Sequence, residues 1–374
     1  MNRAYRYRIY PNSEQKEQLE KTFGCCRYVY NAVLDLQRKR HSEGEKYLSK
    51  INANNWCNRE LKESNPWLRE VDKFALTNAI FALDSGFRKF FDKAGGHPKF
   101  KSKKRSKNSY TTNCTNGNIR VNENSVKLPK LGKVKAAIHR NAPKEWILKS
   151  ATVTKEHDGT YYCSVLYEME TVTVHEARER NEAKVIGLDY KSDGLYMDSE
   201  GKVCGSPKYY AGSMEILAKR QRKLKHKKTG SNNYYKQQKK IAKLHRHTAN
   251  QRKDFLHKES LSIAKAYDIV CVEDLNVRAM SNKGFGNGRA TLDNGYGTFV
   301  NMLEYKLAER GKHLVKVDKW YASSQICSSC GKQHKISLGT GTYRCECGMV
   351  MDRDKNAAIN IKNEGMREFT ELTA

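Results

Sequence analysis

The sequence lacks any long apolar run. None of its 374 residues lies in a segment that approaches the roughly 18 to 20 apolar residues of a membrane-spanning helix. The N-terminal residues are polar and lack the hydrophobic segment of a signal peptide. These two absences favour an intracellular protein without a membrane partner. In a reducing compartment, we interpret seven of the 11 cysteines as core or incidental residues and not as disulfide partners.

Acidic residues are scarce relative to basic ones. Lys and Arg total 70 against 41 Asp and Glu, which gives a formal net charge of +29. The surplus is concentrated, since residues 213–260 carry 15 basic and 3 acidic side chains, and residues 88–108 carry nine and one. Such a surplus points to a polyanionic partner, with nucleic acid as the first candidate. The alternative is that these segments are ordinary solubilising surface.

The chain has no internal repeat, and its length allows two or three domains. Residues 3–10 alternate apolar and basic side chains and predict a strand. Asn12 then offers a helix cap ahead of an apolar stripe, and a second helix is expected to open at Pro66. Further on the period changes to two, and Asp158-Gly159 between two such runs predicts a hairpin. We expect these helices to sit inside a β region that the N-terminal strand completes.

The second half begins after residues 171–183, a polar and charged stretch that we interpret as a linker. Short apolar runs at 184–189 and 267–272 predict buried strands, and a further strand is expected at 313–317. Residues 282–297 are rich in Gly and Asn without an apolar period, and predict a mobile loop.

Three acidic residues stand at the ends of these expected elements. Asp189 and Glu273 each directly follow a short apolar strand, and Asp354 lies at an expected helix N-terminus. Acids at strand ends meet if the strands are neighbours in one sheet, and clustered carboxylates suit Mg²⁺, a hard ion that prefers oxygen ligands. Two such ions about 3.5 to 4 Å apart would activate water and stabilise the leaving oxygen of a phosphodiester. The alternative is that each acid is a turn or cap residue, and Asp352 competes with Asp354 for the third position.

Four cysteines near the C-terminus have metal-ligand spacing. Cys327 and Cys330 are separated by two residues and Cys345 and Cys347 by one, and a glycine follows each pair. Thiolates this close together can hold one zinc ion, and four protein ligands leave no open position, which indicates a structural and not a catalytic zinc. The second arm is one residue shorter than usual. His334 is expected to be exposed and not to be a ligand.

The acids and cysteines lie in motifs that resemble those of a known family. These motifs are IGLD ending at Asp189, VEDLN around Glu273, SSQICSSCG, CECG, and DRDKNAAINI around Asp354. In this order they resemble the TnpB (OrfB) family of transposon-encoded, RNA-guided nucleases, which are related to miniature type V CRISPR effectors. Segments around Tyr7, Trp67 and Pro98 resemble the family's N-terminal half, so the resemblance covers nearly the whole chain.

The resemblance implies an α/β multidomain fold. An RNase H-like (RuvC) nuclease domain with an inserted zinc ribbon would stand beside a β-barrel wedge domain with a helical recognition insertion. The expected boundaries are 1–11 for the first wedge strand, 12–107 for the helical recognition domain, 108–180 for the wedge barrel, 184–325 for the nuclease part with the first two acids, 326–348 for the zinc ribbon, and 349–374 for the nuclease part with the third acid.

The resemblance also implies an activity. Asp189, Glu273 and Asp354 would be the catalytic, magnesium-binding triad of an endonuclease that cuts target double-stranded DNA next to a short target-adjacent motif. The guide RNA would derive from the transposon end, and the protein would be cytoplasmic, and nucleoid-associated when on DNA. Positions that resemble the family's residues near the target-adjacent motif are Lys73, Phe74 and Thr77, with Thr115 and Asn116 as candidates to join them. Core packing is the alternative for Phe74.

The sequence departs from the family pattern at Lys191, where glycine is common, and in the short second cysteine arm. Because of the first departure, the motif does not determine the local backbone conformation of the site. Because of the second, it does not determine the geometry of the zinc site. The Gly- and Asn-rich loop can act as a lid in related nucleases. Three alternatives remain at this point: a nuclease-dead RNA-guided DNA-binding regulator, a transposase that joins DNA strands, and a compact CRISPR effector.

Overall fold

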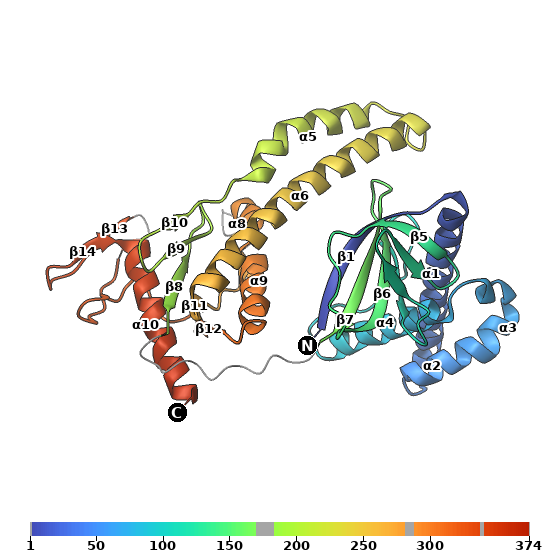
Figure 1. The fold of residues 1–374 in the computed structure, drawn as a ribbon, viewed down its shortest axis with the longest axis horizontal. Helices are drawn as coiled ribbons and strands as arrows, with labels where there is room; N and C mark the ends of the chain where they lie inside the picture. Colours follow the sequence, from blue (N-terminus) through green and yellow to red (C-terminus); the bar gives the residue numbers. More distant parts are fainter. Residues whose placement is uncertain (1, 170–182, 281–287, 337–339, 374) are drawn as a thin grey trace. The chain divides into compact units, whose positions relative to one another are not determined.

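The computed structural model describes residues 2–169, 183–280, 288–336 and 340–373. The chain divides into two compact units, residues 1–171 and 172–374, which are described separately (Figure 1). Among the described helices, none is both long and apolar enough to cross a membrane. The expected linker at 171–183 and the start of the expected loop at 282–297 fall largely or partly outside the described residues.

The first unit is built on a seven-stranded antiparallel sheet whose order is β2-β6-β7-β1-β5-β4-β3. The N-terminal strand β1 (Asn2–Tyr10) lies inside this sheet and pairs with β7 (Tyr161–Glu168) and β5 (Gly132–Ala137). It therefore completes the β region, as its alternating pattern predicted. The expected hairpin is also present, because β6 (Ile147–Lys155) pairs with β7 across a turn in which Gly159 has φ +84°. The remaining strands are β2 (Asn108–Asn113), β3 (Arg120–Asn122) and β4 (Ser125–Leu128).

Helices follow β1 and pack with the sheet around one apolar core. Helix α1 (Ser13–Ser42) begins behind Asn12, which forms a capping box with Gln15. The second long helix does not open at Pro66 as expected. Residues Pro66–Glu70 form a separate 3₁₀ helix, Val71 is extended, and α4 (Lys73–Phe91) starts only after Asp72, whose side chain accepts a hydrogen bond from the amide of Ala75. The shorter helical segments are α2 (Lys50–Trp56), a π-helical turn (Cys57–Leu61) and α3 (Lys62–Ser64).

The second unit contains a five-stranded sheet with the order β10-β9-β8-β11-β12. Its centre is parallel, because β11 (Ile269–Glu273) pairs in parallel with both β8 (Val185–Tyr190) and β12 (His313–Val317). These are the three strands predicted from apolar runs. The antiparallel edge is formed by β9 (Tyr196–Asp198) and β10 (Val203–Cys204).

Helices cover both faces of this sheet. Helices α6 (Asn232–Ala266) and α9 (Tyr296–Ala308) pack on one face, and α10 (Arg353–Thr373) packs on the other. The approach of α10 requires glycine at the strand, because a Cβ on Gly187 would lie 2.1 Å from the carbonyl oxygen of Ala358. Helix α5 (Tyr209–Lys225) runs beside α6 as an antiparallel pair (Figure 1).

The remaining elements lie around the sheet. They are α7 (Val277–Met280), α8 (Gly288–Asn294), and a small antiparallel pair of β13 (Thr342–Arg344) and β14 (Val350–Asp352). Helix α8 corrects the expectation of a loop over 282–297. The Asp293 carboxylate accepts hydrogen bonds from the amides of Tyr210 and Ala211 at the start of α5, and Asn294 donates to the carbonyl of Ser192. Polar contacts with distant segments hold this helix, so no apolar period marks it.

Candidate active site and metal centre

Asp189 and Glu273 lie on the same face of the parallel sheet. Gly187 of β8 is paired with Cys271 of β11, and both residues touch α10. Side chains of a strand alternate between faces, so Asp189 and Glu273, two positions further along, face the same side. Each stands at or next to the carboxyl end of its strand. The two acids singled out from the sequence are therefore neighbours at one edge of the sheet.

The first turn of α10 brings the third acid to this edge. Asp352 caps the helix, because its Oδ1 accepts hydrogen bonds from the amides of Asp354 at 2.8 Å and Lys355 at 3.1 Å. Asp354 instead accepts a hydrogen bond from Lys191 Nζ at 2.6 Å, and Lys191 follows β8 directly. The two acids that sequence spacing left in competition thus have different surroundings, and Asp354 is the one directed toward the strand that carries Asp189.

Like charges and burial shape the titration of this site. The pKa of Asp189 lies well above its usual range because of desolvation, with further contributions from the charges of Glu273 and Asp354. Desolvation also raises the pKa of Glu273, although the hydroxyl of Ser323 donates a hydrogen bond to its Oε1 at 2.6 Å. Burial acts in the same direction on Asp354, but Lys191 and Arg353 outweigh it and lower the net pKa. The charges of both other acids thus add to burial in raising the pKa of Asp189.

The donor set of this edge fits a divalent cation. Asp189 and Glu273 offer carboxylate oxygens whose ionised form needs a compensating positive charge. The hydroxyl of Tyr296 is buried and has no hydrogen-bond partner in the part of the chain that the structure describes. The charges on Asp189 and Glu273 add to burial in raising the pKa of Tyr296, so this hydroxyl lies near both acids. A hydrated Mg²⁺ would supply both the charge and a polar neighbour.

The backbone at Lys191 has an ordinary conformation, although glycine is common at this position in the family. It is not among the residues in the left-handed region, so the turn after β8 does not need a glycine at this position. The lysine instead contributes its ammonium group to the site, where it contacts Asp354 at 2.6 Å and Asp193 at 3.8 Å. The motif comparison marked this position only as a departure and assigned the lysine no role in the site.

The carboxylate repulsion predicts an effect on stability. Folding raises the pKa of Asp189, so its ionised form opposes folding, and this penalty grows as the pH rises above the ordinary carboxyl range. In EDTA at pH 7.5, Asp189→Asn is expected to raise the thermal midpoint by about 2–4 °C for each kcal/mol of repulsion relieved. At pH 4 the difference should shrink. Asp193→Asn, an exposed acid beyond the same strand, is the matched control and should change little; a lower midpoint for Asp189→Asn would contradict this account.

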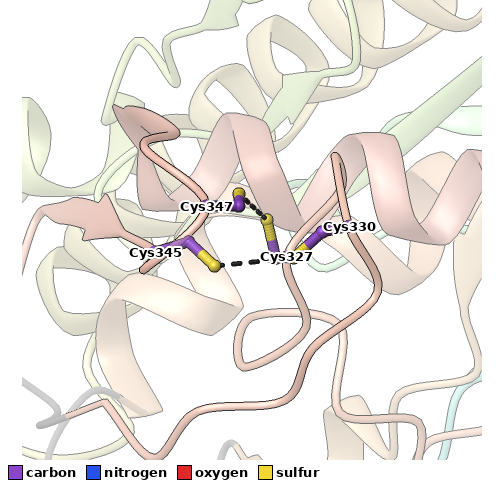
Figure 2. Close-up of side chains that lie close together, drawn as sticks. All are labelled: Cys327, Cys330, Cys345 and Cys347. Carbon is purple, nitrogen blue, oxygen red and sulfur yellow. Dashed lines mark hydrogen bonds between the residues drawn. The ribbon is translucent and has the colours of Figure 1, made fainter.

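The four predicted cysteines converge on one point (Figure 2). Their sulfur atoms all lie within 4.8 Å of one another, and the Cys327–Cys347 and Cys330–Cys345 pairs are 3.7 and 3.6 Å apart. Four Zn–S bonds of about 2.3 Å in a tetrahedron place sulfurs about 3.8 Å apart, so this set fits zinc. Burial opposes ionisation of Cys327, but the backbone amides of Cys330 and Ser329 donate to its sulfur and its pKa falls to about 7.

The short second arm is accommodated by a tight turn. The amide of Gly348 donates to the carbonyl of Cys345 at 3.0 Å, and the amide of Cys345 donates to Met349 at 3.0 Å. Gly348 closes this turn with φ +91°, a conformation that favours glycine. The Cys-x-Cys spacing therefore still delivers two sulfurs. His334 is only half-exposed, contrary to expectation, and its Nε2 lies 3.3 Å from Cys345 Sγ.

Two asparagines connect the zinc segment to the acid site, and the sequence patterns did not assign them a role. Asn360 Nδ2 donates to the carbonyls of Ser323 at 2.8 Å and Ile326 at 2.6 Å. Asn356 donates to Ile326 at 2.7 Å and accepts from the amide of Ser328 at 3.0 Å. Both side chains are buried. Helix α10 and the segment that contains Ser323 are thereby held together, which keeps the hydroxyl of Ser323 on Glu273.

Asn360→Leu tests this connection. The change keeps the branched shape of the side chain but removes the donor to the carbonyl of Ser323, and such an unsatisfied buried group costs about 1–3 kcal/mol. The carbonyl of Ile326 keeps its second donor, Asn356. We expect a lower urea midpoint for the second unit, monitored by hydrogen exchange of α10 amides. Asn363→Leu, at an exposed position of the same helix, is the control. Equal midpoints for the two variants would show that the connection contributes nothing.

Comparison with known proteins shows the family of this chain. The chain is 32% identical to the "Putative RNA-guided DNA endonuclease" of Streptomyces pristinaespiralis, over 98% of this chain and 90% of that protein. The chain belongs to the TnpB (OrfB) family. A second TnpB-family relative, the "Putative RNA-guided DNA endonuclease InsQ" of Escherichia coli K12, is 30% identical over 97% of this chain and 92% of its own length.

Three family models match parts of this TnpB-family chain. They are "Helix-turn-helix domain" at residues 1–46, "Probable transposase" at 164–284 and "Cas12f1-like, TNB domain" at 296–361. The first match covers β1 and the single long helix α1, so its described residues form a strand and one helix and not two helices around a turn. The fold is similar to that of Cas12f1 in a solved complex with single guide RNA and target DNA, with a TM-score of 0.65 and 12% identity over 97% of this chain and 99% of that one.

The residues that resemble the DNA-reading positions of the TnpB family lie in the first unit. Lys73 is exposed at the start of α4, with its Nζ 5.0 Å from the ring centroid of Phe74. Phe74 is half-exposed, so it is not a member of the buried core. Thr77 Oγ1 donates to Asn54 Oδ1 at 2.9 Å.

Thr115 and Asn116 are exposed in the turn that follows β2. Helix α4 is tied to the end of this strand because Asn78 Nδ2 donates to the carbonyl of Thr111 at 2.9 Å and to Asn113 Oδ1 at 3.1 Å. The structure therefore connects the two segments that carry the five candidate positions. Their role in reading DNA stays a prediction.

The basic stretch at 213–260 forms the α5–α6 pair of the second unit. Two open grooves on this pair are lined mainly by cationic and polar side chains: Arg220, Lys223, Gln237, Lys240, Lys243, Leu244 and His247 for one, and Glu215, Ile216, Lys219, Arg222, Lys223 and His226 for the other. The first groove is lined by residues of both helices and the second by residues of α5 and its C-terminal end, so the pair presents positive charge at both grooves.

Proposed function

We propose that this protein is the RNA-guided DNA endonuclease of an insertion-sequence transposon. It would cut target DNA next to a short target-adjacent motif by Mg²⁺-dependent phosphodiester hydrolysis. The observation that carries the proposal is the placement of Asp189 and Glu273 at the ends of the paired strands β8 and β11, together with the hydrogen bond from Lys191, directly after β8, to Asp354 in the first turn of α10. Full-length similarity to relatives named as RNA-guided DNA endonucleases supports it.

Each residue of this edge has a role in the proposed chemistry. Bound Mg²⁺, as one or two ions, would supply an activated water and stabilise the leaving oxygen. Asp189, Glu273 and Asp354 would hold the metal through their carboxylate oxygens. Ser323 orients Glu273 by its 2.6 Å hydrogen bond, and Asp352 orients the first turn of α10 by capping it. Lys191 would leave Asp354 Oδ2 free for the metal by turning away toward Asp193.

The domain assignment follows from the same proposal. Residues 184–325 and 349–374 would form the RNase H-like (RuvC) nuclease domain, with 326–348 as a structural zinc ribbon inserted before the third acid. In the first unit, residues 1–11 and 108–180 would form the wedge barrel, and 12–107 the helical recognition domain. The α5–α6 pair would hold the phosphate backbone of nucleic acid, since cationic grooves attract phosphates without reading sequence.

The guide RNA is the partner that separates this proposal from its alternatives. We expect protein purified without nuclease treatment to carry one dominant RNA species whose sequence matches the end of its transposon. RNase treatment should then abolish binding to a matched DNA duplex in EDTA. RNA that contains a CRISPR repeat would identify a compact CRISPR effector instead, and matched DNA binding that survives RNase would contradict RNA guidance.

A further inference from the structure

The most exposed aromatic side chain among the described residues is Trp320, at 82%. It lies in the turn that follows β12, beside Lys319, whose Nζ is 5.2 Å from the centroid of the indole ring. Large aromatic side chains normally bury most of their surface, and exposing one forgoes about 1.5–3 kcal/mol. An indole that is kept in solvent next to a cation therefore indicates a binding surface.

The turn that presents Trp320 is well anchored. The amide of Trp320 donates to Asp318 Oδ1 at 2.7 Å, and the amide of Tyr321 donates to the carbonyl of Asp318 at 3.0 Å. These bonds hold the backbone of the turn while the indole projects outward. A stacking group held on an ordered turn loses little conformational entropy when it binds.

The same turn is fixed to the acid site at both ends. Val317, at its start, is paired with Glu273 in the parallel ladder, and its carbonyl accepts the amide of Asp274. Ser323, at its other end, donates to the Glu273 carboxylate at 2.6 Å. Trp320 is therefore three residues from Val317, the ladder partner of Glu273, and three residues from Ser323, which donates to the Glu273 carboxylate.

We propose that Trp320, with Lys319, forms a stacking platform for a base of the single DNA strand that enters the acid site. The proposal rests on the proposed nuclease function and adds a positioning residue to it. The indole face would stack on one base, and the Lys319 ammonium would contact the adjacent phosphate. Aromatic stacking on single-stranded DNA is tolerant of base identity and contributes about 1–3 kcal/mol per base. A nuclease guided by RNA pairing would need such a sequence-independent contact.

The test compares oligonucleotides with and without bases. The full chain with its RNA is titrated in EDTA with a 12-nucleotide single-stranded oligothymidylate and with an abasic strand of the same length. For the wild type we expect at least about 5-fold tighter binding of the strand with bases. Trp320→Ala should reduce this affinity ratio to near one without weakening the binding of the abasic strand. Trp320→Phe should keep most of the ratio. Lys319→Ala should instead weaken the binding of both strands by the same factor.

The controls distinguish stacking from structural damage and from other occupants. The Trp320 and Lys319 variants should keep the thermal midpoint of the wild type, because both side chains are exposed. Trp67→Ala, at an exposed tryptophan of the first unit, should keep the base preference. If Trp320→Ala still prefers the strand with bases, the proposal is overturned. It is also overturned if Trp320→Ala no longer binds the RNA but still binds the DNA strands as the wild type does. The assay needs no cleavage, so failure of the nuclease proposal would appear separately, as a complex that binds strands through Trp320 but does not cut.

Discussion

Asp189→Ala is expected to abolish DNA cleavage while leaving RNA-guided DNA binding within about twofold of the wild type. Loss of this carboxylate removes a ligand from a site whose metal would supply several kcal/mol of transition-state stabilisation. Because each 1.36 kcal/mol is a factor of ten in rate, the single-turnover rate should fall by about 10³-fold or more. The measurement is plasmid cleavage in Mg²⁺ beside a gel-shift titration in EDTA.

The first turn of α10 provides a matched pair of variants for the same assay. Asp354→Asn should lose cleavage as Asp189→Ala does, since its side chain is directed toward the β8 strand end. Asp352→Asn should retain cleavage within a few-fold, because asparagine caps a helix as well as aspartate does. Equal losses in the two variants would show that the third ligand position is not specific to Asp354. Full cleavage by Asp189→Ala would contradict the proposed triad.

Cys327→Ser is expected to reduce bound zinc from about one ion per chain to none and to abolish cleavage. Cys327 is the buried member of the cysteine cluster, and structural zinc sites of this kind contribute about 10–16 kcal/mol to the folding of zinc-finger peptides. Loss of zinc would release the segment that Asn356 and Asn360 hold against α10, and with it the Ser323 contact to Glu273.

Elemental analysis of the purified protein measures the zinc content, and plasmid cleavage measures the consequence. Cys114→Ser, at a half-buried cysteine of the first unit, is the control and should keep both. Zinc retained at full stoichiometry by Cys327→Ser would contradict a four-cysteine site. Zinc lost with cleavage intact would show that the module acts independently of the acids.

The strands and their terminal acids followed from the sequence because the signals are local. A continuous apolar run that ends in a carboxylate predicts both the buried strand β8 and the position of Asp189, and the same holds for β11 and Glu273. The short spacing within each cysteine pair predicted that the four sulfur atoms lie together, since thiolates this close in sequence can hold one metal ion. The matching order of the motifs then placed the whole chain in its family.

The contacts that lock the site together did not follow, because they join segments distant in sequence. Asn360 reaches back to Ser323 and Ile326, and Lys191 reaches forward to Asp354 across 163 positions. Spacing also left Asp352 and Asp354 in competition, and only the capping hydrogen bonds separate them. The start of α4 at Asp72 and the helix at 288–294 were missed for a related reason: a cap and distant polar partners decide them, and apolar periodicity does not.

The central claim is tested most directly by cleavage of a plasmid with the reconstituted complex of full chain and transposon-end RNA in Mg²⁺. With a guide that matches the plasmid next to its target-adjacent motif, the account predicts double-strand cleavage at one locus. The same complex with a scrambled guide, or in EDTA, should leave the plasmid intact. Cleavage that ignores the guide, strand-transfer products formed without RNA, or guide-dependent binding with no cleavage would contradict it.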